Sequence, residues 1–199
     1  MKHSVTQIAE LFPDLLRISD ETLRGQVAAV WNEALTSGCG GKGWTFTEIR
    51  AIPFTLLAGE IDLRFVEHLN SCCQQCTAIA EVLGRIFGDR VPVHLDYLIA
   101  GSLLADVGKL LEFDKDASGR VVKGHYGELL RHPFSGVAMC FRHGLPPEVM
   151  HIVATHSHEG DKVERTIESW IFHHADFIDF DIAKVLGKRA AAASKGAAR

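Results

Sequence analysis

The sequence predicts an all-α fold. Apolar residues recur every three or four positions through most of the chain, which is the spacing of one helix face. No segment shows the sustained alternation of a half-buried strand, and the glycine- and proline-containing stretches fall between the helical segments. We therefore expect a helical bundle with short connections. The expected helices cover residues 5–19 with a break at Pro13, then 21–36, 61–87, 94–111, 126–131, 133–143, 147–157 and 166–186.

The segments between these helices read as turns and loops. Asp20 stands where it can cap the second helix. Residues 37–43 are a glycine-rich turn without the order of a phosphate-binding loop. Residues 112–124 form a polar loop that resembles half a calcium loop but has no glutamate at the closing position. We expect neither segment to bind a ligand through its backbone.

Length and composition favour one globular domain. The chain has 199 residues, of which 47% are hydrophobic and 23% charged, enough for a sizeable core. We expect residues 1–55 to form an N-terminal helical extension packed on a core domain of residues 56–187. Residues 188–199, rich in small and basic residues, are expected to be a flexible tail.

Charge and cysteine content exclude several classes of function. A net charge of −4 gives no electrostatic footprint for a nucleic acid. The sequence contains no run of 18 apolar residues, so no membrane span is predicted. The first residues lack the core of a signal peptide. Five cysteines indicate free thiols in a reducing, cytoplasmic compartment. A small-molecule partner is expected, and a homodimer is left open.

Asp106 is the most informative residue, because it falls on the apolar stripe of the helix expected over residues 94–111. A buried carboxylate must be neutralised, paired with a cation or bound to a metal. No arginine shares the stripe, and Lys109 lies beside it, where its stem can reach solvent. The chain also has 11 histidines. A metal is therefore the first hypothesis.

Four further residues on expected core faces complete a candidate ligand set. They are His68, His132, His156 and Asp176. Imidazole and carboxylate together suit manganese, iron, magnesium or zinc. Such a metal would hold several helices of the bundle together.

Five short segments resemble, in the correct order, the HD superfamily of metal-dependent phosphohydrolases. The segment LLADVGK, residues 103–109, is similar to the family's Leu-Leu-His-Asp-Ile-Gly-Lys signature. The other four resemble its first-His helix, its His-Pro element, its following His-His-Glu element and its closing Ala-Asp. They read RFVEHLNSCCQQCTAIAEVL, RHPFSGVAM, IVATHSHEGD and FHHADFIDF. The resemblance covers roughly residues 60–185, and IPFTLL before it looks like a subset of small hydrolases with an N-terminal helical extension.

The resemblance implies an HD-type helical bundle with one or two divalent ions, manganese, iron or magnesium. One ion would lie between His68, a missing histidine, Asp106 and Asp176, and the second between Asp106, His132 and His156. The implied reaction is metal-assisted hydrolysis of a small nucleotide or phosphomonoester. Lys109 would act in catalysis or contact the phosphate, and His125, Lys123 and His158 are candidate substrate contacts.

The chain departs from the family at one position. Ala105 stands where the His-Asp doublet has its histidine, either as natural divergence or as a His-to-Ala change. We expect weaker metal binding and reduced turnover as a result, and recovery of both by orders of magnitude in an Ala105→His protein. Two alternatives remain, namely an HD-type di-iron oxygenase and a degenerate module that senses a nucleotide. Cys73-x-x-Cys76 is interpreted as core packing.

Overall fold

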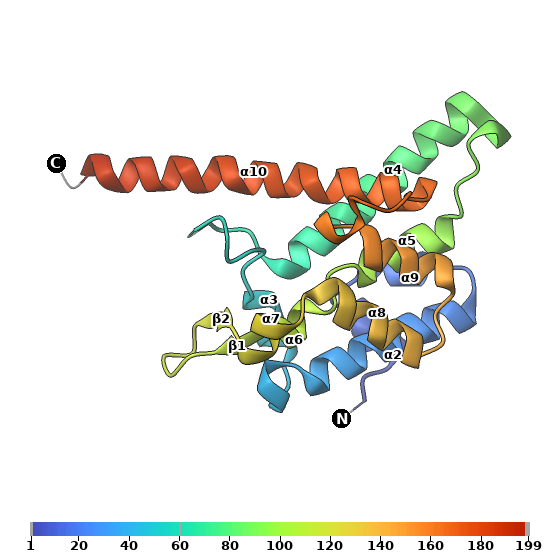
Figure 1. Ribbon diagram of the computed structural model, residues 1–199. Coiled ribbons are helices and arrows are strands. Elements are labelled where there is room, and N and C mark those ends of the chain that lie inside the picture. Colours follow the sequence, from blue (N-terminus) through green and yellow to red (C-terminus); the bar gives the residue numbers. More distant parts are fainter. Residues whose placement is uncertain (1, 60, 198–199) are drawn as a thin grey trace.

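The computed structural model describes residues 2–59 and 61–197, and they confirm the all-α class (Figure 1). The helices are α1 Val5–Ala9, α2 Glu21–Ser37, α3 Phe46–Ala51, α4 Phe65–Phe87, α5 Leu95–Leu104, α6 Lys109–Glu112, α7 His125–Leu129, α8 His132–Arg142, α9 Pro147–Thr155 and α10 Ile167–Ala197. Short 3-10 turns are η1 Pro13–Arg17, η2 Cys39–Gly41, η3 Gly88–Arg90 and η4 His158–Gly160. The strands β1 Phe113–Lys115 and β2 Val121–Lys123 form one small sheet. Within the described residues, no helix is both long and apolar enough to cross a bilayer.

The N-terminal helices begin and end where their sequence signals stand. The break at Pro13 is confirmed, because η1 starts there, and Asp20 caps α2 by accepting from the backbone of Thr22 and Leu23. Helix α3 was not predicted. Its signal was readable, since Thr45 and Glu48 form a reciprocal capping box.

The core joins the N-terminal helices to the rest of the bundle. Helix α5 is central and contacts α2, α4, α9 and α10. In Figure 1, α4 and α10 cross on one side of the molecule, while α2, α8 and α9 lie on the other. A single large cluster combines Phe12 and Trp31 from the N-terminal part with Leu103 of α5 and Met139 of α8. A smaller apolar cluster fills the junction of α4, α5 and α10.

Helix α10 differs from its prediction in length and in burial. It was expected to end at residue 186 and to be buried on most sides, but it continues through Ala197. Phe172, Ala175 and Ala183 are fully buried, whereas Trp170 and Ile182 are about half exposed. Helices α4 and α5 cover one face of α10 and leave apolar residues on its other faces exposed. Apolar residues on several faces therefore did not predict the burial of this helix correctly.

The polar loop expected over residues 112–124 contains a hairpin, so the prediction of a chain without strands was wrong. Phe113 pairs with Lys123 in antiparallel register, and Lys115 pairs with Val121. Asp116 closes the turn by accepting from the backbone N–H groups of Ser118 and Arg120. Strands of three residues are too short for alternation to appear in the sequence.

The helix expected over residues 94–111 is interrupted around Asp106. Helix α5 ends at Leu104, and α6 begins only at Lys109. The intervening turn holds Gly108, where an added Cβ would lie 2.2 Å from the backbone oxygen of His132. The turn therefore lets the chain approach the start of α8 closely, and it carries Asp106 to the same place.

Candidate metal centre

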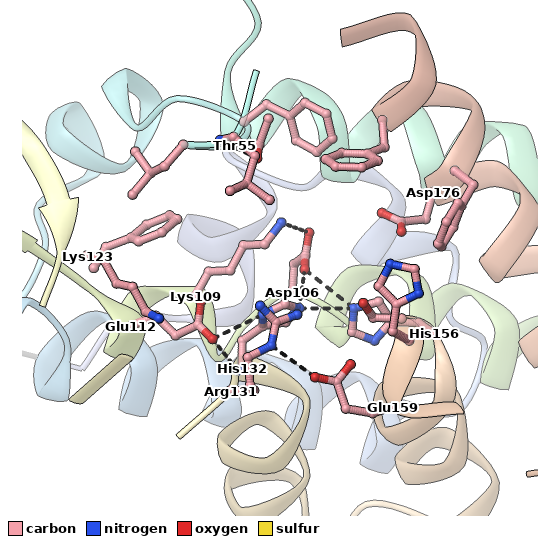
Figure 2. A pocket seen from close by; sticks show the side chains of 18 residues that line it. Thr55, Asp106, Lys109, Glu112, Lys123, Arg131, His132, His156, Glu159 and Asp176 are labelled. Carbon is pink, nitrogen blue, oxygen red and sulfur yellow. Dashed lines mark hydrogen bonds and ion pairs between the residues drawn. The ribbon is translucent and has the colours of Figure 1, made fainter. Parts of the chain in front are cut away.

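Five separate elements bring the predicted ligands together. His68 lies on α4, Asp106 in the turn after α5, His132 at the start of α8, His156 at the end of α9 and Asp176 on α10. Four of them are buried, and the Asp176 side chain is 14% exposed. Figure 2 shows Asp106 between Asp176 on one side and His132 and His156 on the other.

The carboxylate of Asp106 is shared between two groups of side chains. Its Oδ1 lies 3.2 Å from His132 Nε2 and 3.6 Å from His156 Nε2. Its Oδ2 lies 3.3 Å from His68 Nε2, which is in turn 3.1 Å from Asp176 Oδ1. One carboxylate thus joins two potential ligand groups, as a bridging ligand would.

Each of the three imidazoles is oriented by an acceptor at its other nitrogen. His132 Nδ1 lies 3.3 Å from Glu112 Oε1, and His156 Nδ1 lies 2.8 Å from the Val153 carbonyl oxygen. His68 Nδ1 lies 3.1 Å from Asp179 Oδ2. We assign the proton to Nδ1 in each ring because each Nδ1 faces an acceptor. The lone pairs on Nε2 then point into the site.

This set of donors fits divalent metal ions. His132 Nε2 and His156 Nε2 face each other at 3.2 Å, an arrangement that repels unless a cation or proton lies between them. Metal–ligand bonds of about 2.0–2.2 Å place neighbouring nitrogen and oxygen ligands roughly 3–3.6 Å apart. The distances around Asp106 lie in that range. The residues can therefore hold a metal without rearrangement of the backbone.

The charges in the site favour an ionised bridge. Burial would raise the pKa of Asp106, but Lys109 and the imidazoles of His132, His156 and His68 outweigh it and hold that pKa well below its usual range. Burial alone would lower the pKa of His132, yet the carboxylates of Asp106 and Glu112 raise it. The carboxylate is therefore available as a ligand at neutral pH.

Lys109 is not directed to solvent as expected. Its Nζ donates to Asp106 Oδ2 at 2.7 Å, and its side chain is mostly buried. The Nζ also lies 5.4 Å from the centre of the Phe54 ring. The sequence argument set Lys109 aside only as an ion-pair partner of Asp106, because it lies off the apolar stripe, but the turn after α5 brings it to the carboxylate. The positive charge therefore lies inside the site.

A cavity of about 460 Å³ opens onto the candidate ligands. Lys109, Lys123 and Arg131 give it basic groups, and Arg131 Nε donates to Glu159 Oε1 at 2.9 Å (Figure 2). The aromatic side chains that line it are Phe54, Phe113, Phe177 and Phe180. The lining also includes four carboxylates, so the cavity combines charged groups of both signs with flat apolar surfaces.

The remaining predicted residues lie at different places. His158 lines the cavity, is largely exposed and faces Asp161 at 3.2 Å. His125 is exposed on α7, 3.6 Å from Glu128, and is not among the residues that line the cavity. Of these residues, His158 alone borders the cavity.

Sequence reasoning missed the residues that orient the ligands. Asp179 follows Asp176 by three positions, so both lie on one face of α10, and this spacing could have identified it. Glu112 stands three positions after Lys109 and contacts the His132 side chain from α6. The Phe54 ring packs at a tilt against the His68 ring, with 3.9 Å between the centroids. No local pattern marks Glu112, and the resemblance of the IPFTLL segment, which contains Phe54, assigns no role to this ring.

Comparison with known proteins found a similarity in sequence to a phosphodiesterase. No protein-family model matches the chain, and no solved structure is detectably similar to it. The similar protein is the dihydroneopterin 2',3'-cyclic phosphate phosphodiesterase of Methanocaldococcus jannaschii, 36% identical over 124 residues. The match covers 60% of this chain and 47% of the relative, so the chain spans about half of that protein's length.

Proposed function

We propose that this protein is a divalent-metal-dependent phosphohydrolase that hydrolyses a phosphoester of a small molecule. The observation that carries the proposal is the buried Asp106 carboxylate. It faces His68 with one oxygen and His132 and His156 with the other, beneath a cavity whose lining includes basic side chains. A structural ion pair would not need three imidazoles that turn their Nε2 atoms to the two oxygens of one carboxylate.

The proposed ligands form two sets that share Asp106. His68 and Asp176 belong to the first set, and His132 and His156 to the second. A bound divalent ion, manganese, iron or magnesium, supplies Lewis acidity and lowers the pKa of a coordinated water. The protein's own part is to hold these ligands in place through Glu112, Asp179 and the Val153 carbonyl.

The basic groups of the cavity have a separate role. Lys109, Lys123 and Arg131 are proposed to bind the phosphoryl oxygens and to stabilise the negative charge that develops on them during hydrolysis. His158 is proposed as a contact at the cavity rim. We leave His125 out of the substrate contacts, because it lies outside the cavity lining.

The proposed substrate is a small molecule that contains both a phosphate ester and a flat ring system. The relative's name specifies a cyclic phosphate of dihydroneopterin. The four phenylalanines and the cavity of about 460 Å³ support a ligand of comparable size. A 2',3'-cyclic phosphate and a phosphomonoester are therefore the first compounds to test. These observations support a small phosphorylated partner and do not support a homodimer.

The test is hydrolysis by protein stripped of metal and reloaded separately with manganese, magnesium or iron. Candidate substrates are dihydroneopterin 2',3'-cyclic phosphate, 2',3'-cyclic nucleotides and nucleoside monophosphates. We expect metal-dependent product formation that falls at least about a hundredfold in Asp106→Asn. The matched control is Asp181→Asn, an exposed carboxylate on α10 paired with Lys184, which should leave the rate unchanged.

Other outcomes would redirect the proposal. Oxygen consumption without phosphate-ester cleavage would favour the di-iron oxygenase. Tight nucleotide binding without either reaction, in protein shown to contain metal, would favour the sensor. Equal rates in Asp106→Asn and the unmodified protein would exclude the site around Asp106 as the catalytic centre.

A further inference from the structure

The first proposed ligand set consists of His68 and Asp176 with the shared Asp106, and we call it the His68 group. It has one imidazole fewer than the HD family's ligand pattern, because Ala105 stands in place of a histidine. Ala105 is fully buried and packs in the apolar cluster that also contains Cys72, Phe172 and Ala175. Its methyl group offers no atom that could bind a metal. The same cluster nevertheless contains another potential ligand, on the helix that carries His68.

Cys72 is that potential ligand. It follows His68 by four residues on α4, so the two side chains lie on one face of the helix. The same spacing lets two histidines of one helix bind a single zinc ion. The ligand atoms of His68, Cys72 and Asp176 all lie within 4.8 Å of one another. The Cys72 Sγ is 3.9 Å from His68 Nε2, a few tenths of an ångström longer than ligands on one ion require.

The other described cysteines lack these neighbours. Cys73 belongs to the large apolar cluster. Cys76 lies one turn further along α4, and neither of them is among the potential ligand groups. Cys72 is also 3.7 Å from Asp179 Oδ2, so a buried thiol borders two carboxylates and an imidazole. An ordinary core cysteine packs against apolar side chains instead.

We propose that Cys72 binds the metal of the His68 group and takes the place of the imidazole that Ala105 lacks. The inference rests on the metal centre of the proposed function. On binding, the Cys72 S–H bond breaks, the sulfur electron pair forms the bond to the ion, and the proton passes to solvent. No oxidation or reduction takes place.

This ligand changes which metals the His68 group prefers. Thiolate with imidazole and carboxylate favours zinc, iron or cobalt over magnesium, which takes oxygen ligands. The group formed by Asp106, His132 and His156 has no sulfur ligand. The two groups are therefore expected to differ in metal preference.

Cobalt spectroscopy tests the inference without any assay of hydrolysis. Protein stripped of metal is titrated with Co²⁺ under reducing, oxygen-free conditions, and absorption is recorded in the visible and near ultraviolet. We expect d–d bands from bound cobalt and, with them, the intense near-ultraviolet band of a thiolate-to-cobalt charge transfer. Cys72→Ser should lose the charge-transfer band and bind cobalt at this group roughly tenfold or more weakly. Cys76→Ser, the matched control, should keep the charge-transfer band and the cobalt affinity of the unmodified protein.

Several results would overturn the inference. Bound cobalt without a charge-transfer band in the unmodified protein would exclude Cys72 as a ligand, even if Cys72→Ser failed to fold. A band that persists in folded Cys72→Ser would do the same. The absence of any cobalt binding would remove the metal centre itself, and with it the proposed function. A protein with the charge-transfer band but no hydrolysis of any phosphoester would keep the inference and reject the proposed reaction.

Discussion

Asp106 shows how a single side chain acquires its role from its position in the backbone. A carboxylate on a regular helix presents both oxygens to one side. In the turn between α5 and α6, Asp106 instead directs Oδ1 to His132 and Oδ2 to His68. Lys109, three residues later, neutralises part of its charge. The residue is therefore both stabilised by an ion pair and able to bridge two ligand groups.

Replacing Ala105 by histidine tests the departure from the HD pattern. The larger ring enters a filled cluster, so the metal-free protein should lose about 1–3 kcal/mol of stability. With metal present, affinity at the His68 group and hydrolysis should both rise, by about a hundredfold or more. Metal titration, thermal unfolding and phosphoester hydrolysis measure these effects.

Ala105→His should raise metal affinity and hydrolysis more in a protein that also carries Cys72→Ser than in one that keeps Cys72. The reason is that the imidazole and the thiolate would compete for the same ion. Equal gains in both backgrounds would indicate that the two positions act independently. No gain in either would show that the absent histidine does not limit the protein, and the sensor function would then be favoured.

Glu112→Gln tests the residue that orients His132. The glutamine keeps an oxygen for the His132 N–H groups but removes the negative charge that holds the ring. We expect metal to bind about 10- to 100-fold more weakly, as is typical when a ligand loses its hydrogen-bond partner. Calorimetric titration with manganese measures the change. Glu128→Gln on the exposed side of α7 is the control, and an identical affinity in both variants would contradict the assigned role.

At the scale of elements, both the connections and the helix ends position the site. The turn from Ala105 to Gly108 brings Asp106 against the start of α8. The β1–β2 hairpin carries Lys123 to the cavity. Helix α8 begins at His132, with Pro133 in its first turn, so the imidazole lies at a fixed helix start.

Asp96 joins the N-terminal segment to α5 and gives a pH-dependent prediction. Its carboxylate accepts from Ser19 N at 3.0 Å, Ser19 Oγ at 2.7 Å and Asp20 N at 2.9 Å. Burial would raise its pKa, but these hydrogen bonds outweigh it, so the pKa lies below 3.8. The folded state then gains stability above that pH and loses it as the pH falls through the lowered pKa.

Asp96→Asn should therefore lower the free energy of unfolding at pH 7 by about 1 kcal/mol. The difference from the unmodified protein should shrink as the pH falls below about 4. Urea unfolding at several pH values measures it, and Asp89→Asn, at the exposed turn η3, serves as the control. A difference that stays constant down to pH 3 would contradict the assignment of stability to the ionised Asp96.

For the whole molecule, residues 1–55 are proposed to unfold together with the rest. Ile8, Phe12 and Trp31 share one buried cluster with Leu103 and Met139, so separating the two parts would expose apolar surface on both. Calorimetry and tryptophan fluorescence should report one coincident transition. An earlier transition in fluorescence, from melting around Trp31, would instead indicate an independent N-terminal unit.

The sequence by itself determined the helical class and the identity of the candidate ligands. Their signals are local, because periodicity, caps and short motifs need only neighbouring residues. His68, Asp106, His132, His156 and Asp176 could thus be selected before their distances were known, although their roles remain proposals.

Only the tertiary structure decided how these residues meet. The contact of Lys109 with Asp106, the support of His132 by Glu112 and the position of Cys72 beside His68 and Asp176 all depend on packing or turn geometry. The exposure of α10 likewise depends on which of its faces α4 and α5 cover. Contacts between distant segments, and burial, are properties of the packed chain, and no local pattern encodes them.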